Sequence, residues 1–391
     1  MKIAAHTLGC KLNYAETSDM LRRLSEEGNT IVDFHETADL YIINTCTVTA
    51  VAEKKCRNAI RQARRKNPDA QIVVMGCAAE HLKDLPGITQ VITNASKRLL
   101  SYSSGDRTRT FFKIQDGCDY FCTYCAIPYA RGRSRSATVE ETLCAARRIA
   151  ESGAKEVVLT GVNTGTFGQQ HGESFLDLLR GLDQIQGILR YRISSIEPNL
   201  LTDEIIDFTA SSRAFLPHFH IPLQAGSDHV LSLMHRRYDT SLYRSKLQKI
   251  KDVMPDACIA ADVMAGFNGE TEEEFLKVLN FIDSLPISYL HVFTYSDRPG
   301  TAALRLGEKI PIPMRHVHTA RLLELSEKKH AEFISSQLGK ARPVLWESSN
   351  HNGRMEGWTD NYIRLSRPYD MKYINTIETA KITRDAIVRE D

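Results

Sequence analysis

The sequence predicts an α/β protein with a parallel-sheet domain, a longer series of strand–helix units that forms an open, partial (β/α) barrel, and a small all-β barrel. Two observations support this prediction. Short apolar segments alternate with amphipathic helical segments up to about residue 335, as parallel strands do when crossover helices join them. After about residue 338 only short strand-like segments and turns remain. The expected domains are 1–98, 110–335 and 338–391, with a polar linker at about 99–109.

Composition excludes some classes of protein. The chain has 391 residues, of which 42% are hydrophobic and 25% charged, which is ordinary for a globular protein of two or three domains. A net charge of +2 gives no argument for nucleic acid, so an RNA site needs a local patch. The N-terminus lacks a signal-peptide core and no apolar run approaches the ~20 residues of a membrane span. We therefore expect a cytoplasmic protein without a membrane partner, whose nine cysteines indicate metal binding or catalysis.

The first domain places three cysteines at the ends of predicted strands. The strands are KIAAHTL, LYIINT, QIVVMG and ITQVITN, and the helices are Glu16–Glu27, which ends at Gly28, and Val51–Lys66. Cys10, Cys46 and Cys77 each follow one of the first three strands. Because the carboxyl ends of parallel strands lie along one edge, the three thiols can converge on one cluster. Three separate buried cysteines are the alternative.

The helix expected at Val51–Lys66 is strongly basic. Its only acid is Glu53, and its basic residues are Lys54, Lys55, Arg57, Arg61, Arg64, Arg65 and Lys66. Such a run is often a solvated face, and the alternative is a surface that contacts RNA phosphates. The sequence leaves both interpretations open.

The second domain opens with a cysteine motif after the expected strand Arg109–Gln115. Cys118, Cys122 and Cys125 have C-x3-C-x2-C spacing. Three thiolates fit an iron–sulfur cubane and leave one iron open for another ligand. A closed zinc site needs a fourth ligand, and zinc ligands usually come as two separate pairs. The motif therefore predicts an iron–sulfur cluster with an open coordination position.

Five more strand–helix units complete the predicted barrel. The strands are EVVLTGV, RYRISSI, HFHIPL, CIAADVMAG and YLHVFTY, and the helices are Thr138–Ser152, Phe175–Leu182, Asp203–Ala210, Asp228–His235, Leu242–Val253 and Glu272–Leu285. Sites in such barrels gather at the carboxyl ends of strands. Polar residues there are Asn163, Ser195, Glu197, Gln224 and Asp262. They are candidate cofactor or substrate ligands, and ordinary turn and cap residues are the alternative.

Other candidates are expected to be structural. Cys56, Cys144 and Cys258 fall outside both cysteine sets, and His291 in the sixth strand fits a core histidine better than a ligand.

The last segment is too short to bury a core alone, so we expect a small barrel docked on the rest. Its strands are ARPVLWE, YIRLSRP, KYINTIET and AKIT. Trp346, Trp358, Tyr362 and Tyr373 offer stacking faces for RNA, and Arg354, Arg364 and Arg367 offer cations. The alternative is that these aromatics fill the barrel core.

Two sets of motifs carry a resemblance to a known family. The C-x3-C-x2-C loop resembles the radical S-adenosylmethionine (SAM) superfamily, and FKIQDGCDYFCTYCAIPYARGRSRS is similar to its methylthiotransferases. TLGCKxNxxE, NTCTVT and MGC resemble the N-terminal domain of the same family. The resemblance implies a radical-generating 4Fe-4S cluster on Cys118, Cys122 and Cys125, with SAM on its open iron. It also implies an auxiliary 4Fe-4S cluster on Cys10, Cys46 and Cys77.

The resemblance also implies roles for other residues. Tyr124 is expected near the SAM adenine or the cluster, and the polar strand-end residues are expected to contact SAM. Asn13 and Glu16 belong to the N-terminal signature and are expected to support the auxiliary cluster. Arg131, Arg133 and Arg135 follow the cluster loop and are expected to meet the SAM carboxylate or an RNA phosphate, or to solvate the loop.

Within the family, TLGCKxN and HVFxYSxRxGT resemble the branch that acts on N6-threonylcarbamoyladenosine in tRNA, beside the anticodon. The implied product is the 2-methylthio nucleoside. The implied partners are a tRNA anticodon stem-loop, an electron donor such as flavodoxin or ferredoxin, and a sulfur donor. The last module resembles the RNA-binding TRAM barrel in position. Related activities on N6-isopentenyladenosine or a ribosomal-protein aspartate remain open, as does a non-catalytic, zinc-stabilised RNA-binding protein.

Overall fold

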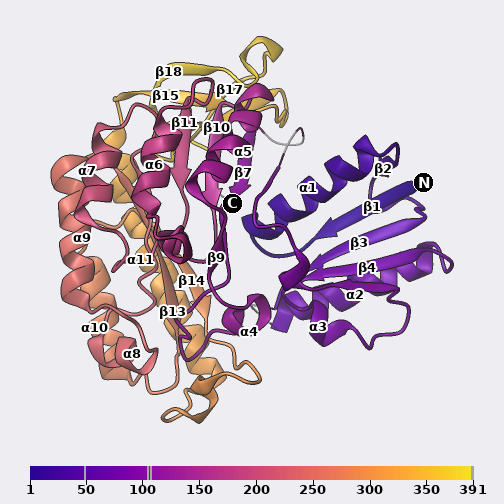
Figure 1. The fold of residues 1–391 in the computed structure, drawn as a ribbon. Helices are drawn as coiled ribbons and strands as arrows, with labels where there is room; N and C mark the ends of the chain where they lie inside the picture. Colours follow the sequence, from indigo (N-terminus) through magenta and orange to yellow (C-terminus); the bar gives the residue numbers. More distant parts are fainter. Residues whose placement is uncertain (48–49, 104, 106–107, 389–391) are drawn as a thin grey trace.

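The structure is a computed structural model that describes residues 1–47, 50–103, 105 and 108–388. Figure 1 shows an N-terminal sheet beside a strand–helix half-barrel, with a second, antiparallel sheet across one end of the half-barrel. The predicted α/β class and its three parts are confirmed.

The N-terminal sheet has five parallel strands in the order β2-β1-β3-β4-β5. They are β1 (Lys2–Thr7), β2 (Thr30–Val32), β3 (Leu40–Thr45), β4 (Gln71–Gly76) and β5 (Gln90–Ile92). Helix α1 (Lys11–Glu26) packs on one face through Met20, Leu21 and Leu24. Helices α2 (Ala50–Lys66) and α3 (Ala79–Leu82) cover the other face. Both faces are buried, which explains the apolar runs of β3 and β4.

Two elements differ from the sequence prediction. Helix α1 begins at Lys11, five residues before the expected Glu16, because Asn13 is held within it by the carbonyls of Leu8 and Thr45 at 2.8 and 3.0 Å. Strand β2 was not expected, because its three residues at a sheet edge give no periodic pattern.

The half-barrel has six parallel strands that follow one another in space as in sequence. They are β7 (Arg109–Lys113), β10 (Glu156–Thr160), β11 (Arg190–Ile193), β12 (His218–His220), β13 (Cys258–Ala265) and β14 (Tyr289–Thr294). A parallel bridge from Tyr191 to Phe215 links the first three strands to the last three. The predicted partial barrel is therefore confirmed.

Helices cover the outside of the half-barrel (Figure 1). They are α5 (Val139–Glu151), α6 (Phe175–Asp183), α7 (Asp203–Ser211), α8 (Asp228–Leu233), α9 (Thr240–Val253), α10 (Glu272–Asp283) and α11 (Ile312–Gln337). Thr138 and Thr271 cap α5 and α10 by accepting backbone N–H bonds from Glu141 and Glu274. One apolar core joins the strands to these helices.

Short elements connect the parts. The expected linker is in part a strand, because β6 (Ser101–Tyr102) pairs antiparallel with β7 at the edge of the half-barrel, and positions 104, 106 and 107 lie outside the described residues. Strands β8 (Gln115–Asp116) and β9 (Arg135–Ser136) pair across the cysteine loop, which contains α4 (Ile127–Arg131). The 3-10 turns are η1 (Asn94–Ser96), η2 (Thr164–Thr166), η3 (Gln169–His171), η4 (Ala302–Arg305) and η5 (Met371–Tyr373).

The C-terminal sheet is antiparallel, in the order β17-β16-β15-β18. Its strands are β15 (Ala341–Trp346), β16 (Arg354–Thr359), β17 (Arg364–Pro368) and β18 (Ile377–Lys381). Strand β16 was not expected, because RMEGWT is polar and contains a glycine. Conversely, the expected strands KYINTIET and AKIT form the η5 turn and the single strand β18. Trp346 lies in the core of this sheet, 3% exposed, so of the two interpretations left open for it the core position holds.

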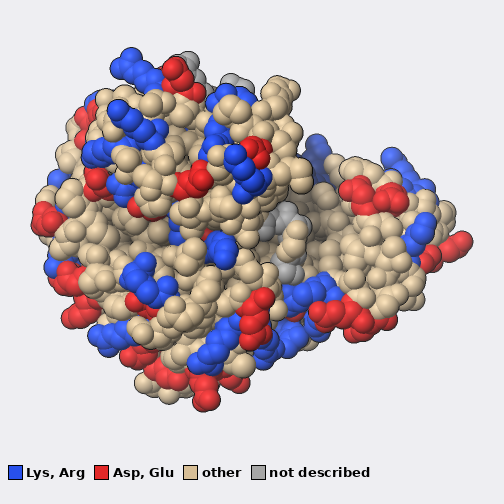
Figure 2. All heavy atoms as spheres, turned by 90° about the horizontal axis from the view of Figure 1, so that it is seen from above, with Lys and Arg blue, Asp and Glu red and all other residues tan. Residues whose placement is uncertain are grey.

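The surface view has two lobes. Figure 2 shows the N-terminal sheet as the smaller lobe, with a hollow between it and the larger body. Basic and acidic side chains are interspersed over most of this face. Among the described residues, no helix is both long and apolar enough to cross a membrane.

Candidate functional site

Three adjacent strands of the N-terminal sheet bring Cys10, Cys46 and Cys77 to one edge. The backbone N–H of Cys77 donates to the carbonyl of Thr45 at 2.9 Å, which places Cys77 beside Cys46. A Cβ atom on Gly9 would lie 3.2 Å from the Cys46 sulfur, so a glycine with φ of +105° is needed there. Burial raises the pKa of the Cys77 thiol, and the nearby Cys10 adds to this. The predicted convergence of the three thiols is present.

Arg131 connects this cysteine edge to the half-barrel. Its Nε donates to the Cys77 sulfur at 3.1 Å, and its Nη1 donates to Glu16 at 3.1 Å and to Asp116 at 2.7 Å. Its Nη2 donates to the side-chain oxygen of Asn13. The side chain is 1% exposed. The expectation that Arg131 meets SAM or RNA or solvates the loop is therefore wrong, because every nitrogen of its guanidinium is bound inside the protein.

Glu16 is the centre of the same buried ion network. It accepts from Lys97 at 2.6 Å and from Lys113 at 2.7 Å, besides Arg131. Burial works to raise the pKa of Glu16, but Arg131, Lys113 and Lys97 hold it well below its usual range. Glu16 and Asn13 therefore support the cysteine edge through Arg131, in agreement with the supporting role predicted for them.

The loop from Cys118 to Cys125 lies at the carboxyl end of the first half-barrel strand. The N–H of Cys118 donates to the carbonyl of Gly132 at 3.1 Å, and the N–H of Cys125 donates to that of Cys122 at 2.9 Å. Burial, with a smaller contribution from the neighbouring cysteine thiols, raises the pKa of Cys118 to about 11 and that of Cys125 to about 12. Thiols with such pKa values become thiolate ligands only when a cationic centre compensates their charge.

Arg236 is a site residue that the sequence prediction missed. Its Nη1 donates to the Cys122 sulfur at 3.2 Å and to the Tyr124 hydroxyl at 3.2 Å, and its Nη2 forms an ion pair with Glu197. Tyr124 and Glu197, both predicted to bind the cofactor, therefore lie beside the cysteine loop. In the sequence, Arg236 is visible only as one of two adjacent arginines shortly after α8. Nothing near it in the sequence indicates that it contacts the distant cysteines.

Three more predicted residues lie near this loop. Asn163 is 2% exposed, and neither atom of its side-chain amide has a hydrogen-bond partner among the described residues. A buried amide in this state favours contact with a bound polar group. Arg133 is solvent-exposed and pairs with Asp119 at 3.3 Å, whereas Arg135 donates to Asp116 at 3.2 Å.

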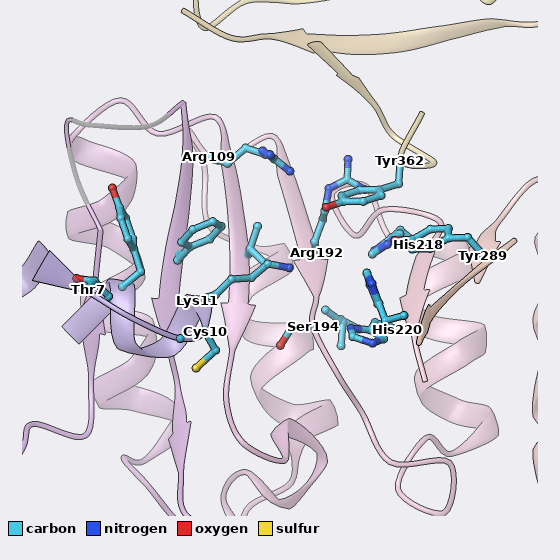
Figure 3. Close-up of a pocket in the computed structure, with 16 residues that line it drawn as sticks. Thr7, Cys10, Lys11, Arg109, Arg192, Ser194, His218, His220, Tyr289 and Tyr362 are labelled. Carbon is cyan, nitrogen blue, oxygen red and sulfur yellow. The ribbon is translucent and has the colours of Figure 1, made fainter. Parts of the chain in front are cut away.

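A pocket of about 490 Å³ lies inside the half-barrel (Figure 3). Three parts of the chain form its wall: the start of α1, the strands of the half-barrel and Tyr362 of the C-terminal sheet. Its lining residues include Cys10, Lys11, Tyr14, Arg109, Phe111, Arg192, Ser194, His218, His220, Tyr289, His291 and Tyr362. This volume suits a nucleoside-sized ligand.

His220 connects residues of the pocket wall. Its Nδ1 lies 3.1 Å from the Ser195 hydroxyl, and its Nε2 lies 2.8 Å from Asp262. Ser195 and Asp262, which were predicted to contact SAM, are therefore held by hydrogen bonds to a pocket residue. His291 is exposed in the same pocket, so its assignment as a core histidine is wrong.

The carboxyl end of β11 leads from the pocket to the cysteine loop. Ser194 lines the pocket, and Glu197, three residues later, pairs with the arginine that contacts Cys122. Gln224 has a left-handed backbone with φ of 64°, and its N–H donates to the carbonyl of Asp262 at 2.7 Å. Cys10 thus lies in the pocket wall, and the chain that continues from Ser194 reaches the arginine beside Cys122.

The basic face of α2 is smaller than its sequence suggests. Arg57 pairs with Glu53 at 2.9 Å, and Arg64 turns back to donate to the carbonyls of Pro68, Ala70 and Gly87. Lys54, Lys55, Arg61 and Arg65 remain exposed. Arg64 is therefore structural and is not a candidate phosphate contact.

Known proteins match along nearly the whole chain. A model of the radical SAM superfamily matches residues 112–282, and one described as uncharacterized protein family UPF0004 matches residues 2–92. The threonylcarbamoyladenosine tRNA methylthiotransferase MtaB of Bacillus subtilis is 37% identical, over 93% of this chain and 89% of its own length. The chain belongs to the radical SAM methylthiotransferase family. It is therefore an enzyme, which excludes the non-catalytic zinc protein.

Other members of the family have similar coverage. The MtaB enzyme of Aquifex aeolicus is 35% identical over 94% of this methylthiotransferase and 97% of its own length. The tRNA-2-methylthio-N(6)-dimethylallyladenosine synthase of Wolinella succinogenes is 32% identical over 95% and 93%. Among solved structures, the radical SAM methyltransferase TsrM of Kitasatospora setae has a TM-score of 0.56 at 13% identity, over 77% of this chain and 76% of its own. That likeness concerns the fold alone.

Membership in the family implies a 4Fe-4S cluster and SAM, and the methylthiotransferase has residues that fit them. A tetrahedral zinc ion needs its cysteine sulfurs about 3.8 Å apart, given Zn–S bonds of about 2.3 Å. Within the described ranges, however, the only group of three His, Cys, Asp or Glu ligand atoms within 4.8 Å of one another is His220, Asp262 and His291. The wider separation of the cysteine sulfurs fits a multi-iron cluster better than a single ion. Asn163, with its unpartnered amide, is available to a bound cofactor.

Proposed function

We propose that this enzyme is a tRNA methylthiotransferase that converts N6-threonylcarbamoyladenosine, next to the anticodon, to its 2-methylthio derivative. The observation that carries the proposal is the 490 Å³ pocket, because Cys10 lies in its wall and Ser194, directly after β11, also lines it. Cys10 forms part of one wall, and the end of β11 connects another wall to the loop of Cys122. A nucleoside in this pocket would meet both centres at once, as an enzyme that joins radical chemistry to sulfur transfer requires.

The proposal assigns each cysteine set to one cluster. Cys118, Cys122 and Cys125 would hold a 4Fe-4S cluster with an open iron for SAM, and Cys10, Cys46 and Cys77 would hold a second 4Fe-4S cluster. When bound, these groups supply the radical and the sulfur. The protein's own part is to hold the target carbon between them and to keep water out of the pocket.

Each of the three parts of the chain has its own role in this function. Residues 1–98 hold the auxiliary cluster, residues 110–335 hold the radical cluster and SAM, and residues 338–391 close the pocket through Tyr362 and bind RNA. The partners are the tRNA anticodon stem-loop, an electron donor such as flavodoxin or ferredoxin, and a sulfur donor. Support for the tRNA comes from relatives that are named tRNA methylthiotransferases.

Two related substrates are the alternatives within the family. The Wolinella succinogenes relative is named for N6-dimethylallyladenosine, whose side chain is a branched hydrocarbon. The pocket here is lined by Lys11, and a cation favours the charged threonylcarbamoyl group instead. A ribosomal-protein aspartate would need a peptide-binding groove, for which the pocket gives no support.

The test uses purified enzyme with reconstituted clusters and two anticodon stem-loops, one with threonylcarbamoyladenosine and one with isopentenyladenosine. Methylthiolation of the first is the expected result, measured by nucleoside mass spectrometry. If only the stem-loop with isopentenyladenosine is modified, the enzyme has the related activity on that nucleoside instead. Iron analysis should give about eight iron atoms per chain, as two cubanes require. Mass spectrometry of tRNA from a strain that lacks the gene tests the same assignment in the cell.

A further inference from the structure

We propose that Lys11 selects the substrate by binding the carboxylate of the threonylcarbamoyl group. This inference rests on the proposed function and names the residue that gives the pocket its specificity. The carboxylate is the only full charge that distinguishes this modified base from its isopentenyl counterpart. A cation in the pocket would therefore contribute binding energy for one substrate and none for the other.

Lys11 is placed where the modified base has to lie. It is the first residue of α1 and directly follows Cys10, and both residues line the pocket. Figure 3 shows its side chain pointing into the cavity, toward Arg192 and away from the sulfur of Cys10. A group bound to the ammonium is thus close to the proposed auxiliary cluster without contact with the cysteine itself.

The two other cations in the pocket wall are already neutralised. Nε of Arg192 pairs with Glu156 at 2.6 Å, and its Nη atoms donate to the carbonyls of Asp360 and Thr359 at 2.9 and 2.7 Å. Arg109 pairs with Glu347 at 3.0 Å. Both arginines therefore fix the C-terminal sheet to the half-barrel, and each already has a carboxylate partner.

Lys11 has no such counter-charge. In the part of the chain that the structure describes, its ammonium forms no ion pair and no hydrogen bond. No Asp or Glu is present among the described residues that line the pocket. An anionic group that enters the pocket would therefore be the first partner of this ammonium.

His218 provides an independent sign of a polar ligand. Its ring is 7% exposed in the pocket wall and stacks on Tyr362 with centroids 4.3 Å apart, yet neither ring nitrogen has a hydrogen-bond partner among the described residues. Burial holds the pKa of His218 well below its usual range, and the charges of Arg192 and Lys11 add to this. A neutral ring can both donate and accept, which suits the hydroxyl and carbamoyl groups of the same substituent.

The experiment changes the charge on each side of the contact. Two stem-loops are compared, one with the natural threonylcarbamoyl carboxylate and one with the primary amide of the same shape. Dissociation constants and kcat/KM are measured for the holoenzyme and for its Lys11→Gln and Lys11→Arg variants. Lys83→Gln is the matched control, because it removes one exposed lysine of the same domain outside the pocket.

The wild type is expected to bind the carboxylate stem-loop about 10-fold more tightly than the amide, as for a charge-assisted hydrogen bond in a pocket. Lys11→Gln should bring the ratio close to one, Lys11→Arg should keep most of it, and Lys83→Gln should leave it unchanged. The iron content of each variant is measured, so that loss of a cluster is distinguished from loss of the carboxylate contact. The amide stem-loop on the wild type tests the same charge even where a variant loses its auxiliary cluster.

Two results would overturn the inference, and they differ. If the wild type methylthiolates threonylcarbamoyladenosine but Lys11→Gln keeps the full preference for the carboxylate, only the role of Lys11 fails. If the wild type neither binds nor modifies either threonylcarbamoyl stem-loop and modifies isopentenyladenosine instead, the proposed substrate fails and the role of Lys11 fails with it.

Discussion

Nε of Arg131 donates a hydrogen bond to the sulfur of Cys77 over 3.1 Å, from the half-barrel to the edge of the N-terminal sheet. The next residue, Gly132, accepts the backbone N–H of Cys118 at 3.1 Å. One short helical turn, α4, therefore contacts both cysteine sites. The buried ion network around this arginine therefore contributes to the relative position of the two sites.

The first prediction concerns this network. Arg131→Met should lower the unfolding free energy by about 3–5 kcal/mol, because it removes one partner from buried ion pairs with Glu16 and Asp116. Thermal unfolding of the cluster-loaded enzyme measures the effect as a lower Tm. Arg133→Met is the matched control, since its side chain is 79% exposed and should change stability by less than about 0.5 kcal/mol. If Arg131→Met lowers Tm no more than Arg133→Met does, the network contributes no stability.

The second prediction separates the two cysteine sets. Replacement of Cys118, Cys122 and Cys125 by alanine should abolish SAM cleavage and leave about four irons per chain. Replacement of Cys10, Cys46 and Cys77 should keep cleavage to 5′-deoxyadenosine but give no methylthiolated product. Cys144→Ala, in an exposed cysteine outside both sets, is the control. SAM cleavage by the first triple variant would refute the assignment.

The third prediction tests Arg236, which binds Cys122, Tyr124 and Glu197. Arg236→Lys keeps the charge but cannot reach three partners at once, because an ammonium lacks the planar fork of a guanidinium. SAM cleavage should fall by about 10- to 100-fold, the cost of a lost charge-assisted hydrogen bond. The electron paramagnetic resonance signal of the reduced cluster should also shift. Arg244→Lys, at an exposed arginine of the outer helix α9, should retain near-normal cleavage, and unchanged cleavage in Arg236→Lys would leave only a packing role.

The fourth prediction concerns the exposed cations of α2. Lys54→Gln combined with Arg61→Gln should weaken tRNA binding and lower its salt slope by about 2, since two fewer counterions are released. Lys277→Gln combined with Lys328→Gln removes the same charge from the outer helices α10 and α11 and should change neither quantity. If both double variants behave like the wild type, the basic run is only a solvated face.

The fifth prediction is a pH dependence of stability. His318 hydrogen-bonds Glu270 at 3.2 Å and Glu272 at 3.0 Å and stacks on Phe275. Burial disfavours the charged ring, but the bonds to both carboxylates outweigh it and raise the pKa of His318 above its usual value. The folded state thus holds the proton more tightly than the unfolded state. Its contribution is full below about pH 6.5 and is lost as the pH rises through the folded-state pKa.

His318→Gln should therefore lower Tm more at about pH 6 than at about pH 8.5. Burial also raises the pKa of Glu270, so the contribution of this carboxyl group to stability also falls as the pH rises. His229→Gln, at an exposed histidine of α8, should show no such difference. A Tm loss in His318→Gln that is the same at both pH values would mean that the ring acts by packing alone.

The sequence predicted the residues that carry local chemistry. The spacing of Cys118, Cys122 and Cys125 is a local property, and so are the caps at Thr138 and Thr271. The convergence of Cys10, Cys46 and Cys77 could also be predicted, although they are far apart in sequence. Strand–helix alternation implies a parallel sheet, and a parallel sheet aligns the carboxyl ends of its strands.

Only the tertiary structure decided which charges are available to a ligand. Arg131, Arg64 and Lys11 look equally exposed in sequence, yet the first two are bound inside the protein and the third points into the pocket. Arg236, His218 and His291 could not be assigned to the site from the sequence, because the residues around them in the fold are far away in sequence. Sequence pattern fixes which face of an element is apolar, but the pairing of a long polar side chain depends on which distant backbone and carboxylate groups come within hydrogen-bond distance after folding.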